Sequence, residues 1–247
     1  MITKDVQKYT VQYTAGACGT LLTWFVNQHR DFPGGDFNIA PEFDIALKAK
    51  SLHWAWIYGD LETAEIPDKF QNWDETVENL KFDLEKNNIK NFQTVCFKTF
   101  PHDIIHDIED ENLLDEIVTT LLDAGITHWI YPVFYKDSNY QYENSRVANR
   151  KYQVIAKRHK DADWIKNKNS GFQSIFETQE LHGFHNPKIS KIIDKYNIKP
   201  LFLDMAALLG NDDDEYNRMV EFLNTERLTN WHDVLMSSVQ FWDMAYA

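Results

Sequence analysis

The sequence predicts an α/β protein, a three-layer sandwich with a central, mainly parallel sheet of four or five strands and a helical carboxyl-terminal section. Two observations predict it. Short apolar segments of strand length alternate along the chain with longer amphipathic segments, an order typical of βαβ units. The 247 residues are 43% hydrophobic and 26% charged, which is ordinary for a globular protein. We expect one domain over residues 1–247, with a lid or insertion at about 136–185.

The first strand is expected at residues 8–14, where apolar and polar side chains alternate with the two-residue period of a half-buried strand. Small residues and glycines at 15–19 predict a loop. Thr20 is expected to cap the next helix, since threonine is a common N-cap residue. That helix should stop before Pro33.

The rest of the chain continues the alternation of helices and strands. Further helices are predicted at residues 74–88, 112–123, 145–159, 188–196, 213–223 and 230–244. Further strands are predicted at 94–97, 126–135 and 200–203. Gly125 is expected at the position just after a helix where a positive φ is needed. The segment 126–135 is almost uncharged, which suits a strand buried on both faces.

The charge balance excludes some classes of partner. There are 25 Lys and Arg residues against 38 Asp and Glu residues, a net charge of −13. Nucleic acids and acidic membrane surfaces attract an excess of positive charge, so neither is expected as a partner. The uncharged window 11–28 contains too many polar residues for a membrane span. Cys18 and Cys96 fit neither a disulfide framework nor a zinc motif, so we expect a reduced, cytoplasmic protein and no metal.

One motif carries chemistry: a strand, then Gly-x-x-Gly-Thr at residues 16–20, then a helix. The glycines permit tight turns, and the loop N–H groups together with the helix N-terminus can hold a phosphate or sulfate group. No lysine follows Gly19, so the motif differs from the nucleoside-triphosphatase P-loop. The alternative is a glycine turn that only links a strand to a helix.

Three segments, in this order, resemble the PAPS-dependent sulfotransferases, where PAPS is 3′-phosphoadenosine 5′-phosphosulfate. They are Ala-Gly-Ala-Cys-Gly-Thr-Leu-Leu-Thr-Trp from residue 15, Phe-Lys-Thr-Phe-Pro-His at 97–102, and the run 200–231. The resemblance covers about half of the chain. It implies a P-loop-type fold of the sulfotransferase kind. It also implies transfer of a sulfuryl group from PAPS, which leaves PAP, to a hydroxyl or amine of a small-molecule or carbohydrate acceptor.

The resemblance also implies roles for individual residues. His102 would be the general base, with His53 as the second candidate for that role. Lys98 would be the cation at the sulfate. The loop residues would hold the phosphosulfate, and candidates for the 3′-phosphate come from the region after the third main strand. These binding candidates are Gly16, Ala17, Cys18, Gly19 and Thr20 for the loop, and Lys136, Ser138, Ser145 and Arg146 for the 3′-phosphate.

The chain departs from the family at several of these positions. Ala17 stands where the family has Lys or Arg, and Cys18 stands where it has Ser. Phe100 occupies the position of the family's catalytic His, and His102 comes two residues later. None of the candidates for the 3′-phosphate matches the family's Arg and Ser cleanly.

Two other functions stay open. Without the loop Lys and with a shifted His, the same fold would suit a protein that binds a nucleotide or a partner without turnover. A second alternative is a zinc hydrolase, because His102 and His106 are four residues apart on a predicted helix and would share one face. Asp103 stands where the zinc-hydrolase pattern has Glu.

Overall fold

The computed structural model describes residues 7–13, 18–26, 28–30, 32, 81, 94–101, 111–135, 137–144, 146–147 and 187–246. Within these residues, four parallel strands form one sheet in the order β2-β1-β3-β4. The strands are β1 (Gln7–Tyr13), β2 (Thr94–Pro101), β3 (Ile126–Val133) and β4 (Lys199–Asp204). The predicted parallel sheet is confirmed for this part of the chain.

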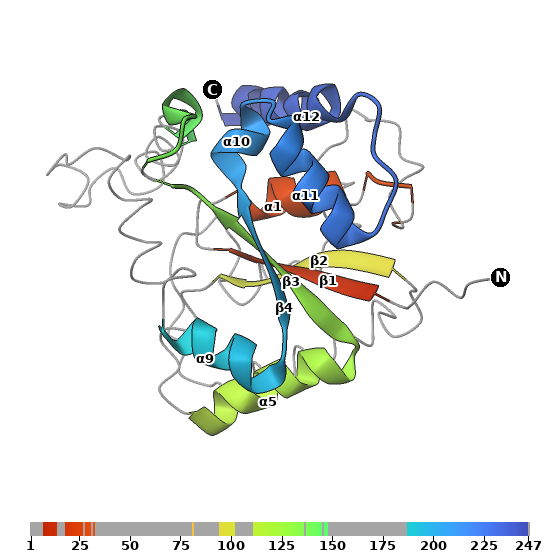
Figure 1. Cartoon of the computed structure of the whole chain (residues 1–247), viewed down its shortest axis with the longest axis vertical. Helices are drawn as coiled ribbons and strands as arrows, with labels where there is room; N and C mark the ends of the chain where they lie inside the picture. Colours follow the sequence, from red (N-terminus) through yellow and green to blue (C-terminus); the bar gives the residue numbers. More distant parts are fainter. Residues whose placement is uncertain are drawn as a thin grey trace, which may run out of the picture.

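Helices cover both faces of the sheet, as Figure 1 shows. On one face lie α5 (Glu111–Asp123) and α9 (Pro187–Tyr196). On the other face lie α1 (Gly19–Val26), α10 (Met205–Leu209), α11 (Asp213–Leu223) and α12 (Trp231–Tyr246). The coarse α/β prediction, with its helical carboxyl-terminal section, is therefore confirmed.

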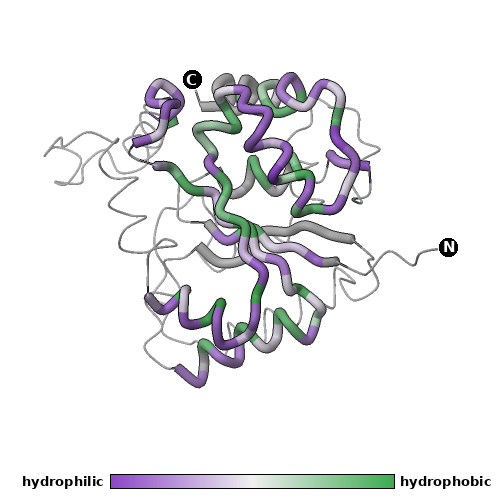
Figure 2. The backbone as a smooth tube through the Cα atoms, in the orientation of Figure 1, coloured by the Kyte–Doolittle hydropathy of each residue, from purple (hydrophilic) through white to green (hydrophobic). Residues whose placement is uncertain are grey.

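The main hydrophobic core lies between the sheet and the helices that follow β1 and β4. Tyr9 on β1 and Ile130 on β3 are fully buried there, together with Leu22 and Phe25 of α1. Figure 2 shows the hydrophobic run that continues from the end of β4 into α10, and every residue of α10 is buried. The Tyr9 hydroxyl donates to the Leu223 carbonyl oxygen at 2.9 Å, so this core also ties β1 to the end of α11.

The opposite face of β1 carries a buried lysine. Lys8 is 4% exposed, and its Nζ donates to the Ala124 carbonyl oxygen at 2.7 Å. That carbonyl lies at the carboxyl end of α5, where the helix dipole favours a cation. Gly125 follows with φ +84°, which confirms the glycine predicted to end this helix.

Some predicted boundaries are wrong. The Leu22 N–H donates to the Cys18 carbonyl at 2.9 Å, so α1 begins at Gly19 and Cys18, not Thr20, is its N-cap residue. Strand β2 continues to Pro101 instead of ending at residue 97. Residues 141–144 are already helical, before the predicted start at 145. The five-residue α10 had no counterpart among the predicted helices.

Other predictions fall mostly outside the described residues. Of the predicted helix 74–88 the structure describes Lys81, which is helical. Residues 148–186, and with them most of the predicted lid, lie outside the described part. Among the helices that the structure does describe, none is both long and apolar enough to span a membrane.

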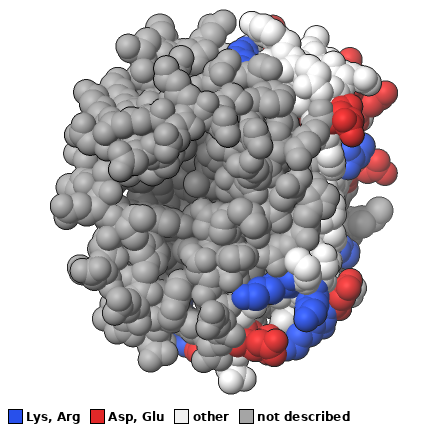
Figure 3. All heavy atoms as spheres, turned by 90° about the vertical axis from the view of Figure 1, so that its left-hand side faces the viewer, with Lys and Arg blue, Asp and Glu red and all other residues white. Residues whose placement is uncertain are grey.

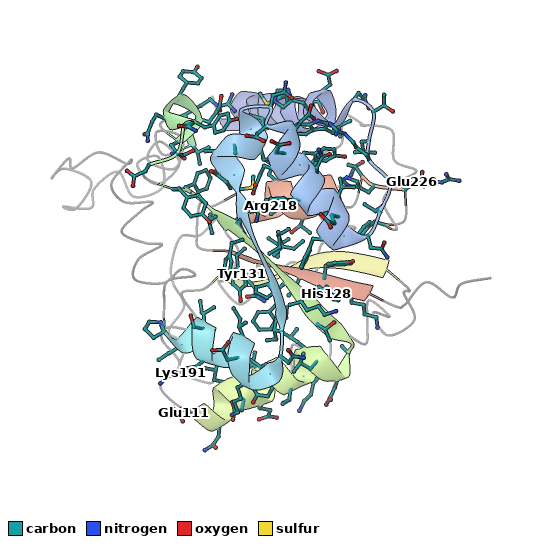
Figure 4. The ribbon with its side chains drawn as sticks, in the orientation of Figure 1. Glu111, His128, Tyr131, Lys191, Arg218 and Glu226 are labelled. Atoms are coloured by element: carbon teal, nitrogen blue, oxygen red, sulfur yellow. The ribbon has the colours of Figure 1, made fainter. Side chains whose placement is uncertain are left out.

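His128 gives the fold a measurable pH dependence. Its ring lies 5.1 Å from that of Tyr9 and 5.5 Å from that of Phe222, toward the amino-terminal end of β3 (Figure 4). Burial, with a smaller contribution from the charge of Lys199, lowers the pKa of His128 to about 4. The unfolded chain takes up this proton near pH 6.5, where histidine normally titrates.

We therefore expect the free energy of unfolding to fall as the pH falls from about 6.5 to about 4, because the unfolded state binds the extra proton in this window. His128 contributes at most about 1.4 kcal/mol per pH unit. Urea unfolding across this range should show that the free energy of unfolding of His128→Gln depends less steeply on pH than that of the wild type. The difference should correspond to up to one proton fewer taken up on unfolding. A dependence as steep as that of the wild type would contradict the assignment.

Candidate functional site

The strand order makes the end of β1 the candidate position for a ligand site. This strand lies between β2 and β3. The chain therefore forms β2 next to one edge of β1 and later returns to form β3 next to its other edge. In open parallel sheets, ligands bind beyond the carboxyl ends of the strands at such a switch point. Tyr13 pairs with Pro101, so β1 and β2 end at the same level. Residues 14–17 follow β1 directly in the sequence, and His102 follows β2.

The start of α1 has a backbone suited to an anion. Cys18 has φ 60°, in the left-handed region, and the helix begins with Gly19. A left-handed residue followed by a right-handed one turns successive N–H groups to one side, which makes a small anion-binding concavity. The first N–H groups of a helix have no acceptor within that helix, and the helix dipole adds a partial positive charge at this end.

Packing fixes this helix against the sheet. Leu21, Leu22, Phe25 and Val26 are buried in the main core. The Thr23 hydroxyl donates to the Gly19 carbonyl at 2.8 Å, within the first turn. The N-terminus of α1 is consequently held in place by the apolar residues of the same helix.

Of the two catalytic candidates, Lys98 stands differently from the prediction. Lys98 was expected after the second strand, but it lies within β2, in register with Val11 and three residues before the strand ends at Pro101. The strand is longer than predicted because it pairs with β1 along almost its whole length. The chain is still extended at Pro101, so no helix begins at that residue. His102 lies just outside the described residues.

Arg146, a candidate for the 3′-phosphate, already has a partner. Its Nη2 lies 2.8 Å from Oε2 of Glu143, at ion-pair distance although not at a hydrogen-bond angle. The Glu143 carboxylate is largely buried, and burial raises its pKa. The guanidinium charge of Arg146 is therefore offset within its own helical segment.

The other binding candidates are only partly visible. Ser138 follows β3, and its hydroxyl donates to Asp204 Oδ2 at 3.4 Å and accepts the Tyr140 N–H at 3.1 Å. Thr20 lies in the first turn of α1, and its side chain is not described. The remaining candidates lie outside the described residues: Gly16, Ala17, His53, His106, Lys136 and Ser145.

A cluster of carboxylates at the end of β4 was not among the predicted site residues. Asp204 caps α10, accepting from the Ala206 and Ala207 N–H groups at 2.9 and 3.1 Å. Its own N–H donates to Glu215 Oε1 at 2.6 Å. Burial raises the pKa of Asp204, and the hydrogen bonds from the Ala206 and Ala207 N–H groups oppose this shift. An Asp between an apolar strand and an apolar run is a recognisable N-cap signal, but α10 is too short to show periodicity.

Arg218 on α11 offsets the charge of this cluster. It forms an ion pair with Glu215 Oε2, and its Nη2 donates to the Phe202 carbonyl at 3.1 Å. Figure 4 labels Arg218 on α11, beside the upper part of β4. The carboxylates at this end of the sheet therefore serve as helix caps and ion-pair partners.

Tyr140 anchors the segment that follows β3. Its hydroxyl donates to Asp212 Oδ2 at 2.6 Å, and this bond raises the pKa of Tyr140 to about 12 and lowers that of Asp212. The ring lies directly over Gly210 in the turn between α10 and α11. Asn144 donates from Nδ2 to the Tyr135 carbonyl at 2.9 Å. This segment is thus held at the same edge of the sheet as the start of α1.

Charges elsewhere on the described surface are mixed in sign. Figure 3 faces the left-hand side of Figure 1 and shows basic and acidic side chains together over α5 and α9. One example is the ion pair of Lys195 with Asp115, which lowers the pKa of Asp115 through a hydrogen bond. Among the described residues, no group of three or more His, Cys, Asp and Glu is placed to hold a metal ion.

The comparisons with known proteins add no family. No family model matches the chain, and neither a curated protein nor a solved structure does so.

Gly210 should be intolerant of a side chain because of Tyr140. A Cβ at this position would lie 2.2 Å from Tyr140 Cδ1 and 3.1 Å from the Ala206 carbonyl oxygen. We expect Gly210→Ala to destabilise the fold by about 1–3 kcal/mol, as overpacking does, measured by urea unfolding.

The control is the same substitution in a Tyr140→Ala background. If the ring causes the strain, the added cost of Gly210→Ala there should fall to about 0.5 kcal/mol or less, since the colliding atoms are gone. An unchanged cost in that background would mean that Tyr140 does not rest on Gly210.

Proposed function

We propose that this protein binds PAPS at the end of β1 and transfers its sulfuryl group to a hydroxyl or amine acceptor, on a P-loop-type α/β fold. One observation carries the proposal: the left-handed Cys18 and the start of α1 at Gly19 follow β1, the strand at the switch point of the sheet. Such an arrangement favours an anionic group.

The sequence supports a sulfuryl donor over a nucleoside triphosphate. Gly19 is followed by Thr20 and not by the lysine of the nucleoside-triphosphatase motif. The three segments that resemble sulfotransferases include this loop, the β2 segment with Lys98, and the run after residue 200. In this proposal the backbone N–H groups and Thr20 hold the 5′-phosphosulfate, and Lys98 or Lys136 supplies positive charge.

The chemistry needs little covalent participation from the protein. The bond between sulfur and the bridging phosphate oxygen breaks, and a bond from sulfur to the acceptor oxygen or nitrogen forms. The acceptor proton passes to a base, for which His102 is suited near neutral pH. Like phosphoryl transfer, the reaction depends on positioning and on stabilising the charge of the leaving group.

A second candidate function is binding of the nucleotide without turnover. Lys98, the cation proposed for the sulfate, lies within β2 and not beyond it, and this favours binding without transfer. Binding and transfer are therefore tested separately.

Titration with 3′,5′-ADP tests the binding site. At one hundred times its Kd, the ligand should stabilise the fold by about 2.7 kcal/mol, and each kcal/mol raises Tm by about 2–4 °C in a chain of this size. Thr20→Ala should weaken the effect about tenfold or more if the hydroxyl binds the anion, whereas Thr20→Ser should retain it. Adenosine, which lacks both phosphates, is the control ligand, and equal shifts with adenosine would contradict an anion site.

Transfer of labelled sulfate from PAPS to a panel of hydroxyl and amine acceptors tests the reaction. His102→Ala should lower kcat by about 10²–10⁴ if His102 is the base, while His106→Ala should remain active. Zinc in the purified protein, with no sulfuryl transfer by the wild type, would favour the His-x-x-x-His hydrolase instead. Binding of 3′,5′-ADP with no transfer to any acceptor would favour the non-catalytic function.

A further inference from the structure

Strand β4 is an outer strand of the sheet within the described part of the chain. Its inner edge pairs with β3, with Leu201 beside Ile130 and Leu203 beside Pro132. An outer strand presents backbone N–H and C=O groups that can pair with a strand of another chain. Proteins protect such edges with proline, with charged side chains or with a covering helix, and β4 shows these devices.

Two side chains of α11 hold the outer edge of β4. The Asp204 N–H donates to Glu215 Oε1 at 2.6 Å. The Phe202 carbonyl oxygen accepts from Nη2 of Arg218 at 3.1 Å, and Figure 4 labels this arginine beside β4. In a strand, the N–H and C=O groups of one residue point to the same edge, and those of the next residue point to the opposite edge. Phe202 and Asp204 therefore belong to the outer edge, and the residue between them belongs to the edge that faces β3.

A proline continues this alternation toward the start of the strand. Pro200 stands two residues before Phe202, so it also belongs to the outer edge. Proline has no backbone N–H to offer to a neighbouring strand, and edge positions are where sheets tolerate it. Along its outer edge, β4 thus has a residue without a donor, then a carbonyl bonded by Arg218, then an N–H bonded by Glu215.

Glu215 and Arg218 act as one unit. They stand three residues apart on α11 and form an ion pair with each other. The Glu215 side chain is 9% exposed and that of Arg218 is 53% exposed. A carboxylate is an acceptor and a guanidinium is a donor. Together the two side chains present β4 with the two kinds of group that the backbone of a neighbouring strand would present.

We propose that Glu215 and Arg218 are an edge guard, which keeps β4 from pairing with β4 of a second copy of this chain. Two identical edges related by a two-fold axis meet through the same surface and run antiparallel. In the register centred on Leu203, Phe202 of one copy lies opposite Asp204 of the other. The Asp204 N–H would then donate to the Phe202 carbonyl of the second copy. These are the donor and the acceptor that the edge guard holds.

The sequence of β4 suits such pairing. Its central residues are Leu201, Phe202 and Leu203, which are uncharged and apolar and pack well on a pleated surface. Exposed apolar edges of this kind pair readily with other chains. A second copy is the occupant that matches, because the two-fold axis supplies the complementary acceptor for each Asp204 N–H without any further partner.

The edge guard is independent of the proposed function. It lies beside β4, whereas the candidate anion site lies at the end of β1, on the other side of β3. Binding of 3′,5′-ADP and self-association are therefore measured separately, and the failure of one leaves the other standing.

Sedimentation velocity over a range of protein concentrations tests the edge guard in the double variant Glu215→Ala, Arg218→Ala. This variant takes the acceptor from the Asp204 N–H and the donor from the Phe202 carbonyl. We expect the dimer to form about tenfold or more tightly than in the wild type, because the two-fold axis repeats each new bond. Equal self-association of the wild type and the folded double variant would overturn the proposal. Circular dichroism checks the fold.

Where the double variant does not fold, Arg218→Ala takes its place, because this side chain is half exposed and its loss leaves the cap of α11 intact. It removes one of the two bonds of the edge guard, so the dimer should form about threefold more tightly. Equal self-association of the wild type and folded Arg218→Ala would then overturn the proposal.

A conservative pair of substitutions separates the edge bonds from the ion pair. In Glu215→Gln, Arg218→Lys, position 215 keeps an acceptor and position 218 keeps a donor, so self-association should remain that of the wild type. Association as strong as in the alanine double variant would overturn the edge guard. Arg227→Ala is the matched control, since it breaks another ion pair of α11, with Asp213, and should leave association unchanged. An increase equal to that of the double variant would also overturn the proposal.

Hydrogen exchange of single amides shows whether the dimer uses this edge. In the dilute double variant, the Asp204 N–H should exchange faster than in the wild type, because Glu215 no longer accepts from it. It should become protected as the protein concentration rises, whereas the Leu203 N–H, on the edge that faces β3, should not change. Association without added protection at Asp204 would place the contact elsewhere and would overturn the proposal.

Discussion

The structure depends on the anchoring of β1 between β2 and β3. Because successive side chains of a strand point to opposite faces, the adjacent residues Lys8 and Tyr9 of β1 bond to segments on opposite faces of the sheet. Lys8 bonds the Ala124 carbonyl directly after α5, and Tyr9 bonds the end of α11. Each such bond contributes about 1 kcal/mol net, and an unpaired buried partner would cost more. The amino-terminal half of β1 is therefore fixed from both faces of the sheet, while Val11 and the apolar residues of α1 pack in the main core beyond it.

The carboxyl edge of the sheet has two chemically different halves. At β1, backbone N–H groups and the dipole of α1 favour an anion. At β4, Asp204 and Glu215 would repel one, but Asp204 is bonded to two backbone N–H groups and Glu215 pairs with Arg218. Asp212 likewise caps α11 and accepts from Tyr140. Among the described residues, these bonds offset the carboxylates at the end of β4, which helps an acidic chain to hold an anion at this edge.

The sequence was a good guide to the elements and a poor one to the contacts between them. Periodicity placed α11 at its observed bounds and β1, α5 and α9 to within a residue or so, since local spacing sets which face is buried. It missed α10, whose five residues are too few for a period. It also placed the cap of α1 at Thr20, because a left-handed Cys18 is not expected from propensity. Tyr140 on Gly210 joins residues 70 positions apart, which no local pattern encodes.

The candidate site has little positive charge of its own. The start of a helix contributes roughly half an elementary charge, while phosphosulfate and a 3′-phosphate together carry several negative charges. Loop residue Ala17 supplies no cation, and Arg146 pairs with Glu143. Lys98 lies in β2, three residues before the strand ends at Pro101, in register with Val11 of β1. It is therefore near the carboxyl edge of the sheet but not beyond it. A site held mainly by backbone N–H groups binds an anion through geometry more than through charge, and its affinity should then depend only weakly on salt.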